Sequence, residues 1–369
     1  MMSAKSDISP TLAEAGESKP DGAGPPSKTN PPRAGARTTA RLIAVLVVTY
    51  VLVVIGLGLH WSRQPPHFSI TGLQLSEVES SGGAPVSGTA VVAAAIGVLE
   101  VLLEKPGGFL YNDIALPGIY LDNIPSWEYG ALKELRDSVR ALRNDFSRSR
   151  TQSVESERMK RADVRLAIDP GSWLMPSAEV EYRQALDELR LFMRDLSLGG
   201  GANAVFYPRA DNLAAYLAVV EKRLGSLAVR LSASVGDHEL TSGLVPPMTS
   251  DSGIQLPDED LPPQSARLST PWHQVDDVFY EARGYTWALL HMMQAIAIDF
   301  ADVLAAKNAL VSVQQIIREL EAATKPMISP IVLNGHGYGF LANHSLVMAS
   351  YLSRANAAVL DLRILMQQG

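Results

Sequence analysis

The sequence contains no cysteine among its 369 residues. This absence excludes disulfide bonds, thiolate metal sites and a cysteine nucleophile, because each of them needs a thiol group. Basic residues are also fewer than acidic ones. Six of the 32 basic and four of the 39 acidic residues precede residue 42, which leaves 26 basic and 35 acidic residues in the rest of the chain. So acidic a domain argues against a nucleic-acid partner.

Large apolar side chains are almost missing from residues 1–41, which are rich in proline, glycine, serine, alanine and lysine. Such a segment buries too little surface to offset the entropy lost on ordering, so we expect a disordered tail. Residues 42–59, LIAVLVVTYVLVVIGLGL, carry no charge and are long enough to cross a bilayer. We expect a single transmembrane helix there, with a buried core helix of a soluble protein as the alternative.

Basic residues flank the apolar segment unequally. Lys28, Arg33, Arg37 and Arg41 precede it, whereas Arg63 is the only basic residue close behind it. Because positive flanks stay in the cytoplasm, we expect a cytoplasmic amino terminus and an extracytoplasmic remainder. A cleaved signal peptide fits less well, since a long leader precedes the span and no small-residue cleavage site follows it.

The chain beyond the span begins with a segment of serine, glycine and proline, residues 60–88, that we interpret as a stalk. One short extended piece is expected in it, around HFSITGLQL. Residues 89–104 are apolar on nearly every side, which predicts a helix in the centre of a bundle. Ser87 or Thr89 can cap the start of that helix.

Three amphipathic helices are predicted next, within residues 126–146, 176–196 and 210–235, and they make the fold class all-α. The third has the most regular period, with apolar residues three or four positions apart. These are Leu213, Leu217, Val220, Leu224, Leu227 and Leu231. Together, residues 89–236 are expected to form a first helical lobe.

Residues 237–270 are rich in proline, serine, glycine and aspartate, which is typical of a flexible connector between lobes. The second helical lobe then covers residues 271–369, and the sequence leaves open whether both lobes share one core. Within it, residues 272–323 hold no proline and predict one very long helix or two nearly collinear ones. Lys307 and Asn308 are the expected break.

Histidines and glycines of the second lobe carry no recognisable site. His291 lies in an apolar helix without an acidic residue one turn away, so we expect a hydrogen-bonded core histidine. The glycines in 335–339 give GxGxG rather than GxGxxG and precede a helix, which argues against a dinucleotide site. His336 and His344 lack ligand spacing. We therefore predict no cofactor and no metal.

The segment GGFLYNDIALPGIYLDNIPSWEYG, residues 107–130, follows neither the helix period nor the strand period. In one interpretation its tyrosines and isoleucines seal the bundle surface, while its aspartates and asparagines make turn hydrogen bonds. In the other, Asp113, Asp122 and Glu128 are catalytic carboxylates that share acid and base work, or they bind calcium. No diagnostic spacing decides between these interpretations.

Five long stretches resemble a proteobacterial family catalogued as a domain of unknown function, number twenty-three thirty-three. They are KPGGFLYNDIALPGIYLDNIPSWEYG, RLSASVG, VDDVFYEARGYTWALLH, FADVLAAKNALVSVQQIIRELE and GFLANHSLVMASYLSRANAA. The resemblance runs from about residue 40 to the end. It implies an inner-membrane protein with a periplasmic helical domain, and it implies no activity and no catalytic residues.

Two functional hypotheses follow. The first is a membrane-anchored periplasmic scaffold or adaptor with a protein partner in the envelope, because the chain has one span, amphipathic helices and no recognisable catalytic set. The second is an envelope hydrolase that uses Asp113, Asp122 or Glu128. Carboxylates that converge in a pocket favour the enzyme, and carboxylates scattered over the surface favour the scaffold.

Overall fold

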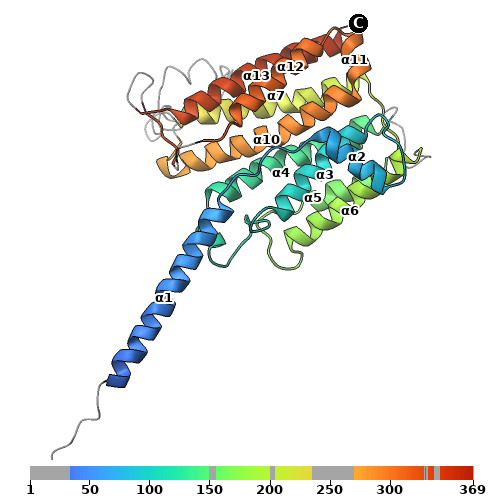
Figure 1. The fold of residues 1–369 in the computed structure, drawn as a ribbon. Helices are drawn as coiled ribbons and strands as arrows, with labels where there is room; N and C mark the ends of the chain where they lie inside the picture. Colours follow the sequence, from blue (N-terminus) through green and yellow to red (C-terminus); the bar gives the residue numbers. More distant parts are fainter. Residues whose placement is uncertain are drawn as a thin grey trace, which may run out of the picture. The chain divides into compact units, whose positions relative to one another are not determined.

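The computed structural model describes residues 34–148, 155–199, 204–234, 270–327, 329, 331–335 and 341–368. These residues form α-helices and no strand, which confirms the predicted all-α class (Figure 1). The helices are α1 (Ala34–Trp61), α2 (Ile70–Ser80), α3 (Thr89–Glu104), α4 (Asn123–Ala141), α5 (Glu157–Leu166), α6 (Ala178–Ser197), α7 (Ala210–Ala233), α10 (Val275–Asp299), α11 (Ala301–Ala306), α12 (Leu310–Ala323) and α13 (His344–Gln367). Most of the predicted tail and of the 237–270 connector lies outside the described residues.

Helix α1 contains the apolar segment that we predicted to span a membrane. Its portion Thr38–Trp61 has the length and composition of a membrane span, and its most apolar stretch, of mean hydropathy 2.9, is 0% buried. The helix begins at Ala34, so the predicted tail is helical from that residue onward. The chain divides into two compact units, Met1–Leu52 and Val53–Gly369, and the second unit holds all the other helices.

Helix α10 lies in the middle of the second unit. It packs against α3 and α4 on one side and against α12 and α13 on the other (Figure 1). Helix α3 is buried on nearly every side, because it packs against α2, α4, α6 and α10. The central position that its all-round apolar sequence predicted is confirmed.

Two glycines allow α4 and α10 to cross in close contact. A Cβ atom at Gly284 would lie 1.8 Å from the backbone oxygen of Trp127, and one at Gly130 would lie 1.9 Å from the backbone oxygen of Glu281. No side chain fits in this space, so the crossing needs glycine in both helices. The close approach brings Trp127 within 5.0 Å of Trp287, measured between ring centroids.

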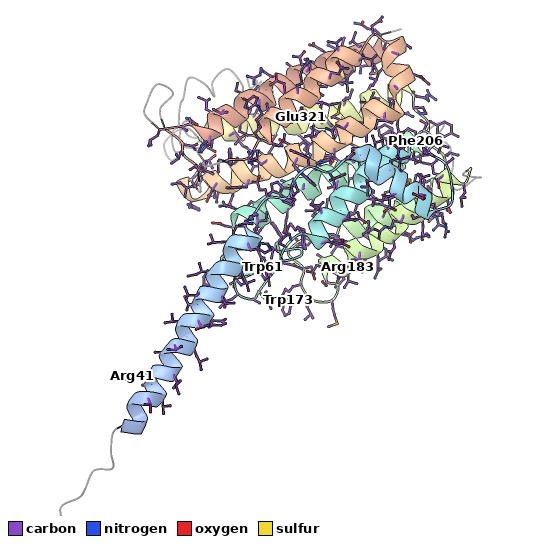
Figure 2. The ribbon with its side chains drawn as sticks, viewed as in Figure 1. Arg41, Trp61, Trp173, Arg183, Phe206 and Glu321 are labelled. Carbon is purple, nitrogen blue, oxygen red and sulfur yellow. The ribbon has the colours of Figure 1, made fainter. Side chains whose placement is uncertain are left out.

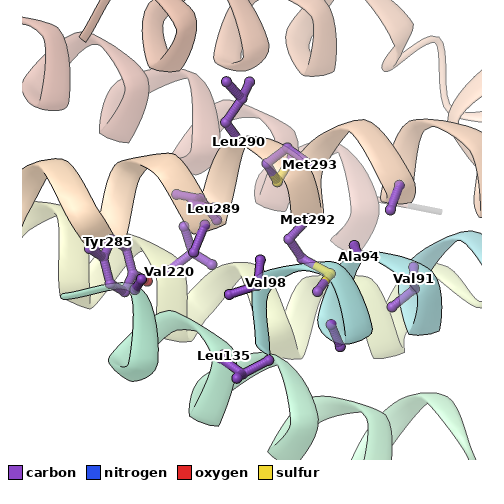
Figure 3. Close-up of a cluster of buried hydrophobic side chains, with 14 of the residues drawn as sticks. Val91, Ala94, Val98, Leu135, Val220, Tyr285, Leu289, Leu290, Met292 and Met293 are labelled. Atoms are coloured by element: carbon purple, nitrogen blue, oxygen red, sulfur yellow. The ribbon is translucent and has the colours of Figure 1, made fainter. Parts of the chain in front are cut away.

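Helices from both predicted lobes share one hydrophobic core. The cluster in Figure 3 joins Val98 of α3, Leu135 of α4, Val220 of α7 and Leu289 of α10. The apolar stripe of α7 is buried as predicted, and this helix packs chiefly against α13. The spatial groups of helices therefore do not follow the division of the sequence at residues 237–270.

Residues 272–323 form a helical hairpin and not the collinear helices that we expected. The predicted break at Lys307 and Asn308 is present, and Asn308 has a left-handed φ of 54°. A second break at Phe300 separates α10 from the short α11. Helix α12 then returns along α10, and its final carbonyl groups reach Arg283 near the start of α10.

The segment expected as a stalk contains helix α2. The extended piece predicted around HFSITGLQL is wrong, because Ser69 caps a helix over Ile70–Ser80 with its side chain. Ile70, Gln74 and Val78 of α2 are buried against the core. The spacing of four between these residues gives one buried helical face.

Candidate functional site

Glu128 is buried in the core and forms an ion pair with Lys105, which is also buried. Its carboxylate accepts hydrogen bonds from the backbone nitrogen of Leu110, at 2.9 and 3.0 Å, and from that of Tyr111, at 2.8 Å. Burial raises the pKa of Glu128 to about 7, although Lys105 and the two amides favour its charged form. The group ties the start of the 107–130 segment to α4.

Asp113 and Asp122 have local roles. The Oδ1 atom of Asp113 accepts a hydrogen bond of 3.0 Å from the backbone of Ala115, which makes a turn within the loop. Asp122 is the N-cap of α4, and its side chain accepts from the backbone of Asn123 at 2.8 Å. Helix α4 thus starts before Ser126, the residue from which we expected it to begin.

The three predicted site residues do not converge on one another. No hydrogen bond or ion pair joins any two of Asp113, Asp122 and Glu128 within the described ranges. The same described residues contain no group of three or more histidine, aspartate or glutamate side chains that could hold a metal ion. Each carboxylate is held by groups of its own, so the arrangement offers no shared acid and base pair.

The tyrosines and isoleucines of the connector seal the bundle only in part, because Ile124 is buried in the core and most of the others are exposed. Tyr120 is 81% exposed, and Ile114 and Ile119 are exposed as well. The apolar residues of the segment that bury their side chains are Phe109 and Leu110 at its start and Ile124 and Trp127 near its end. The segment therefore presents apolar side chains outward.

Sequence analysis missed a second buried carboxyl group, that of Glu134 in α4. Its oxygens accept hydrogen bonds of 2.7 and 2.8 Å from the Ser138 hydroxyl and a further one from the Tyr216 hydroxyl. Burial raises the pKa of Glu134 to about 7, and nearby Asp137 raises it further. The sequence signal that could have indicated this contact is the spacing of four residues between Glu134 and Ser138, which places both side chains on the same face of the helix.

Asp299 at the end of α10 supplies the cap for α3, a role that we had assigned to Ser87 or Thr89. The carboxylate of Asp299 accepts a hydrogen bond of 2.7 Å from the backbone of Val91. Burial raises the pKa of Asp299 to about 6, and its bonds to backbone amides lower it. A negative charge there also interacts favourably with the helix dipole.

A cavity of about 570 Å³ lies where the chain leaves α1. Its walls come from residues 62–67, from α4 and α10, and from the end of α12. Three basic side chains, Arg63, His67 and Arg283, line it together with Trp127 and apolar groups, and its lining includes no carboxylate. Burial lowers the pKa of His67, so Arg63 and Arg283 supply the positive charge of the cavity wall.

Arg283 in this cavity binds backbone and amide oxygens rather than a carboxylate. It donates to the side chain of Gln64 at 2.9 and 3.1 Å, and to the backbone oxygens of Ala323, Thr324 and Lys325 at 2.9 to 3.3 Å. The carbonyl groups belong to the end of α12, where a helix dipole stabilises a positive charge. Arg283 thus joins the residues after α1 to the end of α12.

His291 is the hydrogen-bonded core histidine that we predicted. Its Nε2 atom accepts a hydrogen bond of 3.2 Å from the backbone of Phe68, so Nδ1 donates to the Trp287 carbonyl at 2.8 Å. The ring also stacks on the Phe68 ring with centroids 3.9 Å apart. Burial lowers the pKa of His291 to about 4. The neutral ring holds the residues before α2 on α10.

The fold and these contacts define a helical protein with one candidate membrane-spanning helix and no converged set of catalytic carboxylates in its described residues. The family described as uncharacterized protein conserved in bacteria (DUF2333) matches residues 34–369, and the chain belongs to this family. The resemblance noted in the sequence is confirmed, and residues 1–33 of the predicted tail lie outside the match. No curated protein and no solved structure matches the chain.

Proposed function

We propose that the protein is a scaffold or adaptor of the bacterial cell envelope, anchored in the inner membrane by α1. The observation that carries the proposal is the exposure of α1, because none of the residues in its most apolar stretch is buried. An apolar helix of that length is stable in the hydrocarbon layer of a membrane, where its backbone groups are satisfied internally.

The proposed orientation places the amino terminus in the cytoplasm and the helical domain in the periplasm. It is supported by the four basic residues Lys28, Arg33, Arg37 and Arg41 before the span and the single Arg63 close behind it. A reporter that is active only in the cytoplasm should be silent when it is fused after Gly369. The same reporter fused before Met1 is the matched control and should be active, and activity at both ends would contradict the orientation.

A scaffold is favoured over an envelope hydrolase because the candidate carboxylates have structural roles. Asp113 makes a turn, Asp122 caps α4 and Glu128 is paired with Lys105. A hydrolase needs an acid and a base within reach of one substrate bond, and these three groups share no hydrogen-bond or ion-pair partner in the part of the chain that the structure describes. The binding surfaces of a scaffold need no such convergence.

Complementation of a deletion strain tests this choice. Asp113→Asn and Asp122→Asn should each complement fully, because the amides can still accept the hydrogen bonds that the carboxylates accept. Leu224→Asp is the matched loss control, since it buries a charge in the core and should abolish function. Loss of function in an aspartate variant that melts like the wild type would favour the hydrolase.

A further inference from the structure

Two loops of the helical domain expose an unusual number of large apolar side chains. One loop lies between α3 and α4, and the other directly precedes α6. In the first, Ile114, Leu116, Ile119 and Tyr120 are exposed, and in the second, Trp173, Leu174 and Met175 are exposed. We call these seven residues the apolar loop pair. Trp173 is 53% and Met175 86% exposed, so the surrounding protein leaves much of this surface in contact with solvent.

The two loops are held together as one surface. The side-chain amide of Asn112 donates a hydrogen bond of 3.0 Å to the backbone oxygen of Ser172, which directly precedes Trp173. The conformation of Met175 is also unusual, because it has a left-handed φ of 36°. Such a backbone conformation is unfavourable for a residue with a Cβ atom, and here it accompanies a side chain that points away from the core.

This surface lies beside the last turn of α1. A Cβ atom at Gly58 would contact Pro117, at 3.6 Å, and Trp61 lies against Gly107, within 2.8 Å of a Cβ position there. Both contacts join the end of α1 to the connector that carries half of the apolar loop pair. Figure 2 shows Trp61 and Trp173 at the same end of the helical domain.

We propose that the apolar loop pair inserts into the headgroup region of the membrane that α1 spans. The inference rests on the proposed anchoring by α1. A span that ends at Trp61 places its last turn at the boundary of the bilayer, and the loops beside that turn are then at the same depth. Tyrosine and tryptophan, present here as Tyr120 and Trp173, are the side chains enriched at this depth. Apolar residues beside them add buried area in the interface.

The absence of cysteine from the sequence allows a direct test with single nitroxide labels. Tyr120→Cys and Met175→Cys place a label on each loop of the full chain, reconstituted in vesicles of phosphatidylethanolamine and phosphatidylglycerol. The measurement is the collision rate of each label with oxygen, which enters lipid, relative to that with a charged nickel chelate, which stays in water. At both positions the ratio should be at least about threefold higher than at an exposed position away from the membrane.

Val311→Cys is the matched control, because Val311 is 68% exposed and lies at the start of α12. Only the opposite end of α12 reaches the cavity beside the end of α1. Twelve residues of helix separate Val311 from Ala323, a length of about 18 Å. Val48→Cys, within α1, reports on the anchor itself. In one contrary outcome, the label at Val48 is exposed to lipid, while the labels at Tyr120 and Met175 are as exposed to water as the label at Val311. That result would overturn the inference and leave the anchoring by α1 intact. Water exposure at Val48 would overturn both. A protein partner for the loops predicts the first of these results, since the vesicles contain no partner.

Discussion

Replacing Glu134 with glutamine removes a buried ionisable group and keeps most of its volume. Burial among α4, α7 and α10 raises the pKa of this carboxyl to about 7, against a usual value of 4.5. One pKa unit corresponds to about 1.4 kcal/mol, so ionisation costs about 3 kcal/mol more in the folded state than in the unfolded state. Glutamine cannot ionise, and it can accept a hydrogen bond from Tyr216 or Ser138 with its oxygen.

The sign of the effect follows from proton binding. Between pH 4.5 and pH 7 the folded state binds more protons at Glu134 than the unfolded state does, so the stability contributed by this group falls as the pH rises. Above pH 7 the carboxyl is ionised in both states and the full cost is present. Burial also raises the pKa values of Glu128 and Asp299, which add pH dependence of the same sign. The difference between wild type and Glu134→Gln isolates the contribution of Glu134.

The assay is urea unfolding of the full chain in a non-ionic detergent, followed by circular dichroism at about pH 4 and about pH 8. The stability of Glu134→Gln relative to wild type should rise by about 3 kcal/mol between these conditions. Leu75→Gln is the matched control, since Leu75 is an exposed residue of α2 that does not titrate and its replacement should give the same difference at both pH values. A difference for Glu134→Gln that does not change with pH would refute the assignment of a buried, easily protonated carboxyl.

Two further substitutions test the helix crossing and the buried ion pair. Gly284→Ala should lower the free energy of unfolding by about 3 kcal/mol or more, because the new Cβ atom collides with the Trp127 backbone. Gly225→Ala, with its nearest contact at 3.7 Å, should be neutral or slightly stabilising, and equal effects of the two would contradict the crossing. Lys105→Met should lower the free energy of unfolding by about 3 kcal/mol at pH 8, measured by urea unfolding. The loss should be smaller at pH 5, where Glu128 takes up a proton, and a loss that does not vary with pH would contradict the pairing.

The sequence predicts individual helices well where apolar residues recur at helical spacing over many turns. The stripe of α7 from Leu213 to Leu231 is an example, and every one of its six predicted positions is buried. Helix α2 was missed because one of its three buried positions is Gln74, which binds Thr89 at 2.7 Å and carries no apolar signal. The start of α4 was placed at Ser126 rather than at Asn123, although Pro125 in between is tolerated because proline fits the first turn of a helix.

Contacts between helices were beyond prediction because they join residues distant in the sequence. Gly130 and Gly284 meet across the α4 and α10 crossing, and Asp299 caps a helix that begins about two hundred residues earlier. The sequence around one residue of such a pair does not indicate which distant residue it contacts. For the candidate site, the sequence located Glu128 in an unusual segment, but it did not indicate Lys105 as the partner of Glu128. In the structure both side chains are buried and form an ion pair.

The contacts of residues 62–69 explain how the apolar loop pair can keep its place beside α1. A free stalk would let the helical domain move away from the membrane surface. Instead Gln64 is bound by Arg283, and Phe68 is hydrogen-bonded to and stacked on His291. Both partners lie on α10, the central helix of the domain, so the residues that follow α1 are fixed to a largely buried helix. Because Trp61 directly precedes these residues, the same contacts hold the end of α1 against the connector at Gly107. In the proposed anchoring, these contacts keep the loops beside the last turn of α1.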